Sequence, residues 1–506
     1  MPEPRLWQLT ACSAVLGLAL AAGAVAAAGP WDTGQRKAER ARAAATEGTG
    51  GAHHARTGAP AAPPRPAPAP SAAGVLRALD TPRTTRPADL AATLVPLLAD
   101  PGLGPLRTAS VVDVATGRQL YGEGATTPMT PASTIKIATT AAALSALGPD
   151  HRITTTVVAS PDGRTLTLVG GGDPTLDRAR LTTLAASTAR ALGPRRTTPV
   201  RLTYDTSLYQ GPSRHPIGPN DNIAPVSALM TREGRLDDST HGPAPRTADP
   251  AADTATTFAG LLGRAGVHVT GTPTPGRAPT VTTAQDHKAP ASPGATNTGT
   301  PTTPTTGTTT TTDPKTPQTG TLLARTHSAP LADLVERTLT HSDNDLAEAL
   351  ARQTALAHRQ PASFTGAAKA VRDELTRLGL PTTGAHFADG SGLSRADRLS
   401  AALLTALLTR AADPAHPALR PVLTGLPVSG FTGTLQDRFD TTTAHTGAGL
   451  VRAKTGTLTG VNTLAGTVVT TDGRLLAFAF LAGRTPSPAT AQPALDRLSA
   501  ALTAPR

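Results

Sequence analysis

The chain has 506 residues, a length that favours two or three domains over one. Only 38% of the residues are hydrophobic and 2% are aromatic, so some segments cannot contribute to a packed core. The formal net charge is +11, but the basic residues are not interleaved with aromatic residues in one patch, which argues against a nucleic-acid partner. An anionic wall polymer or an anionic membrane surface fits this charge better.

The N-terminal segment predicts export. Residues 9–28 carry no charge, Arg5 precedes them, and three alanines end the run at Ala28. A cleaved signal peptide and an uncleaved membrane anchor both fit residues 1–28. The basic residues that follow the run favour the signal peptide. The only cysteine, Cys12, lies in this segment, so the body of the protein is expected to have neither a disulfide nor a cysteine metal site.

Two segments of low complexity are expected to stay unfolded. Residues 29–87 are rich in Ala and Pro and are interpreted as an extended tether. Residues 294–319 are rich in Thr and are interpreted as a disordered loop within the folded part. Neither segment has enough apolar side chains to offset the entropy lost on ordering.

The folded body is expected to begin near residue 88. Alternating patterns predict a hairpin over 109–121 and strands over 153–158, 165–169, 464–470 and 475–482. A segment dominated by Ala and Leu and stopped by Gly148-Pro149 predicts a helix over 133–147. An amphipathic pattern predicts a helical region over 331–352 with a break near Ser342, and further helices are expected over 401–411 and 493–502. Strands at both ends with helices between them predict an α/β (α+β) body whose sheet is completed by the C-terminal strands.

Three short motifs follow one another along this body. They are Ser133-Thr134-Ile135-Lys136, Ser342-Asp343-Asn344 and Lys454-Thr455-Gly456-Thr457. Each motif alone is most often a helix cap or a strand end. Together, in this order and on these elements, they indicate a catalytic site. The chain has few lysines, and two of them fall in the motifs; the full set is Lys37, Lys136, Lys288, Lys315, Lys369 and Lys454.

The spacing of Ser133 and Lys136 suits nucleophilic catalysis. A serine hydroxyl needs a base to take its proton, and a lysine three residues later lies on the same face of a helix. Lysine can serve as that base only if burial or a neighbouring cation lowers its pKa, and Lys454 is a candidate for that cation.

The other motif residues suit the remaining steps of an acyl transfer. Lys454, Thr455 and Gly456 are expected to bind the substrate, with Lys454 attracting its carboxylate and the Thr455 hydroxyl donating to it. Ser342 is expected to relay a proton to the leaving amine, and the Asn344 amide to bind the substrate backbone. The backbone N–H groups of Ser133 and Thr457 are expected to form the oxyanion hole.

The ordered set S-x-x-K, S-D-N and K-T-G resembles that of penicillin-binding proteins and class A β-lactamases. Further segments make the chain most similar to the low-molecular-mass class C penicillin-binding proteins, the D-Ala-D-Ala carboxypeptidase/endopeptidase family. These segments are Leu168–Leu176, Ala224–Leu229, Asp389–Arg395 and Leu426–Gly430 followed by Gly433-Thr434-Leu435. The resemblance covers most of the chain from residue 88 onward.

The resemblance implies a serine transpeptidase/β-lactamase-like domain formed by residues 88–159 and 326–506. The long gap between the first two motifs implies inserted domains at residues 160–325, which the strand patterns and Gly-rich turns suggest are mainly β. The implied substrates are peptidoglycan stem peptides, cleaved through an acyl-enzyme with no metal or organic cofactor. β-Lactams would acylate Ser133. The implied location is outside the cell, in the wall or at the membrane.

Two rival functions are compatible with parts of the sequence. A β-lactamase would turn over β-lactams rapidly, but no segment suggests a deacylating Glu loop. A catalytically inactive wall-binding or antibiotic-sensing module would not need every motif side chain, and all of them are present. The sequence leaves open the oligomeric state and the balance of carboxypeptidase, endopeptidase and transpeptidase activity, because these activities share one acyl-enzyme.

Overall fold

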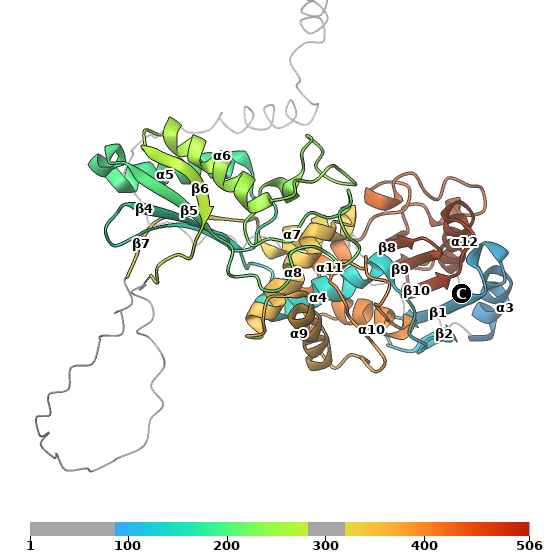
Figure 1. Cartoon of the computed structure of the whole chain (residues 1–506). Helices are drawn as coiled ribbons and strands as arrows, with labels where there is room; N and C mark the ends of the chain where they lie inside the picture. The colour runs from blue at the N-terminus through green and yellow to red at the C-terminus, as the bar shows by residue number, and fades with distance from the viewer. Residues whose placement is uncertain (1–86, 282–318, 505–506) are drawn as a thin grey trace, which may run out of the picture. The chain divides into compact units, whose positions relative to one another are not determined.

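The computed structural model describes residues 87–281 and 319–504 (Figure 1). The predicted leader at 1–28, all of the tether except Pro87, and all of the Thr-rich loop except Thr319 lie outside the described residues. Within those two ranges, no helix combines the length and the apolar character that a bilayer crossing requires.

The first sheet has five antiparallel strands in the order β2-β1-β10-β9-β8. It unites the two ends of the described chain, because β1 pairs with β10 along its whole length. The predicted hairpin and the predicted C-terminal strand pair are confirmed. The strands are β1 (Leu106–Asp113), β2 (Gln119–Glu123), β8 (Val451–Leu458), β9 (Val461–Val469) and β10 (Leu475–Gly483).

Strand β10 is apolar on both faces because helices cover both sides of the sheet. Its side chains alternate between two cores, as the period of a strand requires. Ala477, Ala479 and Leu481 join the core that contains α4 (Ile135–Leu147) and α10 (Ala401–Ala412). Leu476, Phe478, Phe480 and Ala482 join the core that contains α3 (Pro87–Leu98) and α12 (Pro488–Ala500).

The core around α4 is mostly helical. Every residue of α4 from Ile135 to Leu144 is buried, so this helix lies at the centre of its neighbours. The surrounding helices are α7 (Leu331–His341), α8 (Asn344–Ala357), α9 (Phe364–Arg377), α10 and the short α11 (Pro421–Thr424). The predicted helices over 133–147, 331–352 and 401–411 are confirmed, including the break at Ser342.

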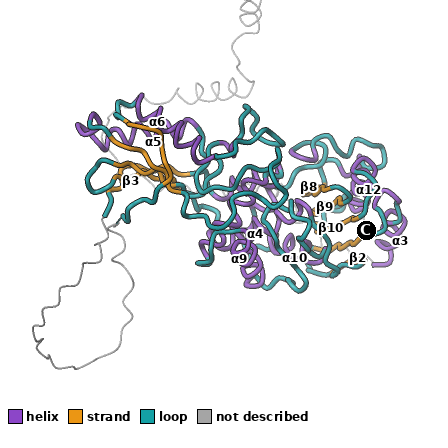
Figure 2. The backbone as a smooth tube through the Cα atoms, viewed as in Figure 1, coloured by secondary structure: helices purple, strands orange, loops and turns teal. Residues whose placement is uncertain are grey.

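The second sheet has the order β6-β5-β4-β3-β7 and is mixed. Its strands are the orange segments that run beside the label β3 in Figure 2. Strands β4, β5 and β6 are parallel neighbours, and the helices α5 (Arg178–Leu192) and α6 (Pro250–Arg264) lie between them in sequence. Strand β3 pairs antiparallel with both β4 and β7. The strands are β3 (Thr154–Ala159), β4 (Thr165–Val169), β5 (Val200–Asp205), β6 (Val269–Pro275) and β7 (Thr321–His327).

The α/β fold class expected from the sequence is confirmed, but the inserted region is mixed α/β where a mainly β unit was expected. Its sheet also reaches slightly beyond the expected 160–325, from Thr154 to His327. Helix α5 was missed although Asp177 caps it and Leu181, Leu184 and Ala185 form a buried stripe. The Thr and Arg residues between these positions lower the local hydrophobicity and hide the helical period.

Candidate active site

Ser133 lies in a tight turn that leads into α4. The turn is a single 3-10 turn over Ala132–Thr134, and Ala132 adopts a positive φ of 47°, which is uncommon for a residue with a side chain. The hydroxyls of Thr134 and Thr463 donate to the carbonyl of Pro131 over 2.7 and 2.8 Å. The turn is thereby held against β9, and Ser133 stands at the start of α4 as the sequence predicted.

Lys136 is fully buried one turn beyond Ser133. Its Nζ lies 3.0 Å from Ser133 Oγ, 2.7 Å from Asn344 Oδ1 and 2.6 Å from the carbonyl oxygen of Ser391. A neutral amine has two N–H donors and one lone pair. The two fixed oxygens take both donors, so the lone pair of the neutral amine faces the hydroxyl of Ser133.

Burial lowers the pKa of Lys136 to about 8, although the carboxylates of Asp389, Asp343, Glu348 and Asp397 act in the opposite direction. An amine with this pKa is partly unprotonated near neutral pH and can accept a proton. Burial is the main cause. The sequence suggested that the charge of Lys454 would lower the pKa of Lys136. The effect instead acts on Lys454, because burial and then the charge of Lys136 lower the pKa of Lys454 well below its usual value.

The second motif forms the break between α7 and α8. Ser342 adopts the left-handed conformation with a φ of 58°, and Asp343 caps α8 by accepting from the Leu346 N–H over 3.0 Å. The chain turn directs Asn344 toward Lys136. Its Oδ1 accepts from Lys136, while its Nδ2 donates to the carbonyl of Asn222 over 2.9 Å, so the orientation of the amide is determined from both sides.

The third motif lies on β8, which is an edge strand of the first sheet. Lys454 is fully buried and donates to the carbonyl of Thr455, whose hydroxyl donates to Thr434 Oγ1; both distances are 2.8 Å. A Cβ at Gly456 would lie 2.2 Å from Thr463 Oγ1 and 2.7 Å from the carbonyl oxygen of Pro131. Only glycine therefore lets β8 approach the turn that carries Ser133.

A cavity of about 270 Å³ joins these elements. Ser133, Ser342, Asn344 and Thr457 line it. Lys136 lies behind the wall in contact with Ser133 and Asn344, and Lys454, Thr455 and Gly456 precede Thr457 on β8. The structure thus brings the three motifs together around one space.

The sequence did not point to several other residues that line this cavity. They come mainly from the segment before α6 and from the residue that precedes Ser342, and they are Asn222, Arg235, His241, Arg246, His341 and Thr434. The rings of His241 and His341 are stacked with centroids 4.5 Å apart. Thr434 lies in a segment that resembles the family, but the sequence suggested no role for it. The other residues, apart from His341, lie in the Pro- and Gly-rich stretch 211–246, where no periodic pattern predicts a contact.

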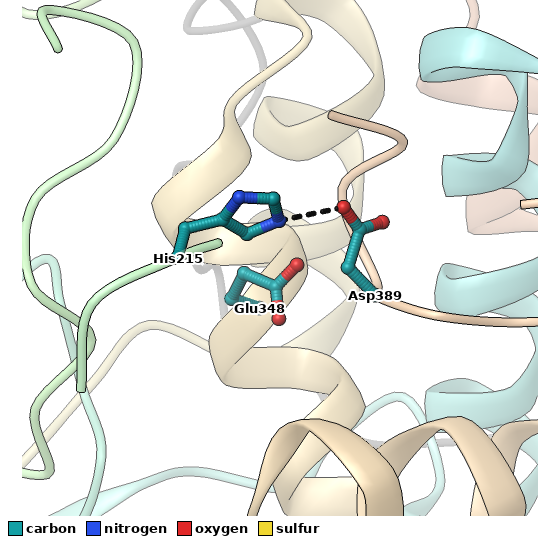
Figure 3. A group of neighbouring side chains, drawn as sticks. All are labelled: His215, Glu348 and Asp389. Carbon is teal, nitrogen blue, oxygen red and sulfur yellow. Dashed lines mark hydrogen bonds and ion pairs between the residues drawn. The ribbon is translucent and has the colours of Figure 1, made fainter. Parts of the chain in front are cut away.

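Two clusters of buried acidic and histidine side chains have the spacing of metal ligands among the described residues. One contains Glu233, Asp343 and Asp345. These carboxyl groups form ion pairs with Arg235, Arg246 and Arg337, so the cluster links the segment before α6 to the second motif. The other contains His215, Glu348 and Asp389 (Figure 3).

Comparison with known proteins decides the family. Residues 90–246 and 304–502 match the D-Ala-D-Ala carboxypeptidase 3 (S13) family. The chain belongs to this family. Carboxypeptidase DacB of Mycolicibacterium smegmatis is 38% identical over 464 residues, which cover 88% of this chain and 90% of that protein. The D-alanyl-D-alanine carboxypeptidase of Actinomadura sp. is 31% identical over 75% of this chain and 78% of its own length.

A solved structure supports the fold of this S13 family member. Penicillin binding protein 4 (dacB) from Haemophilus influenzae superposes with a TM-score of 0.60 at 21% identity, covering 83% of this chain and 98% of its own. The family resemblance that the three motifs predicted is confirmed, and so is the prediction that the chain is a serine-type peptidase.

Proposed function

We propose that this S13 family member is a D-Ala-D-Ala carboxypeptidase in which Ser133 is the nucleophile and Lys136 is its base. The observation that carries the proposal is the 3.0 Å separation of Ser133 Oγ from the buried amine of Lys136, at the wall of a cavity that the other motifs also line. The family and the curated relatives provide the substrate class, a peptide that ends in D-Ala-D-Ala.

In the first step, Lys136 takes the hydroxyl proton while Ser133 Oγ bonds to the carbonyl carbon of the penultimate D-Ala. The negative oxygen that forms is held by the backbone N–H groups of Ser133 and Thr457, and such a pair lowers a barrier by a few kcal/mol. The carbon–nitrogen bond then breaks. Ser342 relays a proton to the departing amine, and D-Ala leaves.

In the second step, water attacks the acyl-enzyme and releases the shortened peptide and free Ser133. The substrate carboxylate is bound by Lys454 and by the hydroxyl of Thr455, whose proton turns from Thr434 Oγ1 to the carboxylate when substrate binds. A carboxylate beside Lys454 favours the charged form of that lysine. The positive charge on Lys454 then favours the neutral form of Lys136, the form that can act as a base.

Acylation by a fluorescent penicillin tests this assignment. We expect one labelled species for the wild type and none for Ser133→Ala, because a β-lactam carbonyl is attacked by the same hydroxyl. Ser207→Ala, a change at an exposed serine, is the matched control and should label as the wild type does. Labelling that persists in Ser133→Ala would show that another residue is the nucleophile.

The same acyl-enzyme serves carboxypeptidase and endopeptidase reactions. We propose terminal D-Ala release as the main reaction, since the curated relatives that cover most of this chain are named carboxypeptidases. Isolated muropeptides separate the two activities, because one releases D-Ala and the other converts cross-linked dimers to monomers. Rapid repeated turnover of nitrocefin would instead favour a β-lactamase.

We further propose that the protein acts outside the cytoplasm, in the wall or at the membrane. The uncharged run at residues 9–28 supports export, and the peptidoglycan substrate lies outside the cell. Mass spectrometry of the mature N-terminus distinguishes a signal peptide cleaved near Ala28 from a retained membrane anchor. Recovery of the full-length protein in the cytosolic fraction would contradict export.

A further inference from the structure

We propose that His215 is a positioning residue for the catalytic amine of Lys136. It acts through the Asp389 carboxylate and the loop Asp389–Ser394, whose Ser391 carbonyl orients the amine. The inference rests on the proposed role of Lys136 as base. It assigns a catalytic task to a residue of the inserted region, which lies outside the three motifs.

His215 and Asp389 form a buried pair between segments that are 174 residues apart in sequence (Figure 3). Nε2 of His215 lies 2.8 Å from Oδ2 of Asp389, and each side chain is only 1% exposed. The N–H of Ile217 donates to Nδ1 over 3.2 Å, so Nδ1 is the acceptor and Nε2 carries the proton that Asp389 accepts. The ring also packs edge-on against Phe364, with centroids 5.4 Å apart.

The carboxylate of Asp389 accepts hydrogen bonds from the backbone that follows it and thereby determines the conformation of that backbone. Oδ1 accepts from the N–H groups of Ser391 and Gly392 over 3.1 and 2.6 Å, and Oδ2 accepts from that of Ser394 over 2.7 Å. Gly392 has a φ of 83°, and a Cβ there would lie 2.1 Å from the carbonyl oxygen of Ala132, so the loop packs directly on the nucleophile turn.

Glu348 of α8 holds the same loop from the other side. Its Oε1 accepts from the N–H groups of Gly390 and Ser391 over 2.9 and 3.0 Å, and its Oε2 pairs with Arg352 over 2.9 Å. Asp389 thus holds the peptide plane of the Ser391 carbonyl directly, through the Gly392 N–H, and Glu348 holds the two peptide planes before it. The Ser391 carbonyl accepts from Lys136 over 2.6 Å. This is the shortest of the three contacts of the amine.

The spacing of His215, Glu348 and Asp389 would also suit a metal ion, but the hydrogen bonds favour the positioning role. All four carboxylate oxygens already accept from backbone N–H groups, from His215 or from Arg352. An ion would have to displace these donors and would release the loop. The carboxylate oxygens of Glu348 and Asp389 are therefore occupied by the hydrogen bonds and the ion pairs that hold this loop in place.

The test uses the full chain and separates binding of a β-lactam from acylation. In His215→Leu the donor to Asp389 is lost, so we expect the acylation rate constant to fall about tenfold while the dissociation constant of the initial complex is unchanged, since a hydrogen bond of ordinary strength changes a barrier by about one decade. In His215→Gln the amide nitrogen takes the place of Nε2, and most of the rate should return.

The chain offers a matched control in His358. Its Nε2 lies 2.8 Å from Oε2 of the buried Glu374, so His358→Leu removes a histidine–carboxylate contact of the same length that does not involve the loop. We expect this variant to acylate at the wild-type rate. Thermal unfolding of each variant shows the cost in stability separately from the rate.

The outcomes are distinguishable. A wild type that is not acylated at Ser133 contradicts the proposed function itself. A wild type that is acylated, with His215→Leu equally fast, contradicts the role of His215 alone. Equal losses in the leucine and glutamine variants would make His215 a packing residue. If His215→Leu does not fold, His215→Phe keeps the ring contact with Phe364 without the donor, and the same loss is expected.

Discussion

Two opposing effects determine the pKa of Lys136. Removal from water disfavours its charged form, whereas four nearby carboxylates favour it, and the first effect prevails. The sequence predicted a base at this position from its spacing to Ser133 alone. It could not predict the carboxylates, because they lie on α8, on the break before it and on the loop after α9.

The rate of acylation is expected to depend on this one amine. The pKa of Lys136 is lowered to about 8, and only the unprotonated form accepts the proton of Ser133. The rate constant should therefore rise with pH through about 8 and level off above it. Stopped-flow measurement with a chromogenic β-lactam on both sides of pH 8 tests this, and a rate that falls across this range would exclude an amine base.

Lys136→Arg is the matching variant because it keeps the charge and removes the ability to lose a proton. It should bind β-lactams without forming the acyl-enzyme.

Asp397 predicts a second effect of pH, on stability. Burial and the charge of Asp389 raise the pKa of Asp397 to about 9, from 3.8 in the unfolded chain. Between these two pKa values only the unfolded chain loses the proton, so the stability falls progressively as pH rises from 3.8 to about 9 and changes no further above it. Asp397→Asn imitates the neutral acid, so it should unfold like the wild type at low pH, become increasingly more stable than the wild type over this range, and keep the full difference above it. Thermal unfolding across the range measures the difference, and equal pH dependence in both proteins would contradict the raised pKa of Asp397.

At the scale of elements, the site depends on how closely β8 approaches the turn before α4. Gly456 permits this approach, since a Cβ would meet Thr463 and the Pro131 carbonyl. Gly456→Ala should destabilise the protein by about 1–3 kcal/mol, the usual cost of overpacking, and should slow acylation by moving Thr457. Gly260→Ala is the control, because its Cβ would meet nothing within 4 Å and alanine favours helix α6. Denaturant unfolding and acylation rates compare the two, and a neutral Gly456→Ala would disprove the close contact.

The elements that carry the motifs were predictable for a physical reason. Helix α4 is rich in Ala and Leu and ends at Gly148, the break at Ser342 is followed by the capping residue Asp343, and strands β9 and β10 have runs of buried apolar residues. The contacts of Asn222 and His215 had no such signal. One acts through a backbone carbonyl, and the other is a single histidine whose partner lies 174 residues away.

At the scale of the whole described chain, the segment between β5 and α6 contacts several catalytic elements. Asn222 binds Asn344, His215 binds Asp389, and Arg246 pairs with Asp345 over 3.0 Å with both side chains at most 5% exposed. The inserted region therefore supplies part of the wall of the site, in addition to forming its own sheet.

Arg246→Ala tests this attachment. It leaves Asp345 buried without its cation, which typically costs about 3–5 kcal/mol. The pKa of Asp345 is already raised to about 7, chiefly by burial, and loss of Arg246 raises it further. The neutral acid tolerates burial, so the loss of stability should be smaller below pH 7 and larger above it. Adding Asp345→Asn should recover stability at the higher pH. A penalty independent of pH would show that the ion pair is not the cause.

The burial of the two motif lysines has a practical consequence for chemical modification. Lys136 and Lys454 are 0% exposed, whereas the side chain of Lys369, the third lysine in the described ranges, is 51% exposed. Succinimidyl esters react with accessible, unprotonated amines. Dyes or surface linkers of this kind should therefore attach at Lys369, within this part of the chain, and leave the capacity to react with penicillin intact.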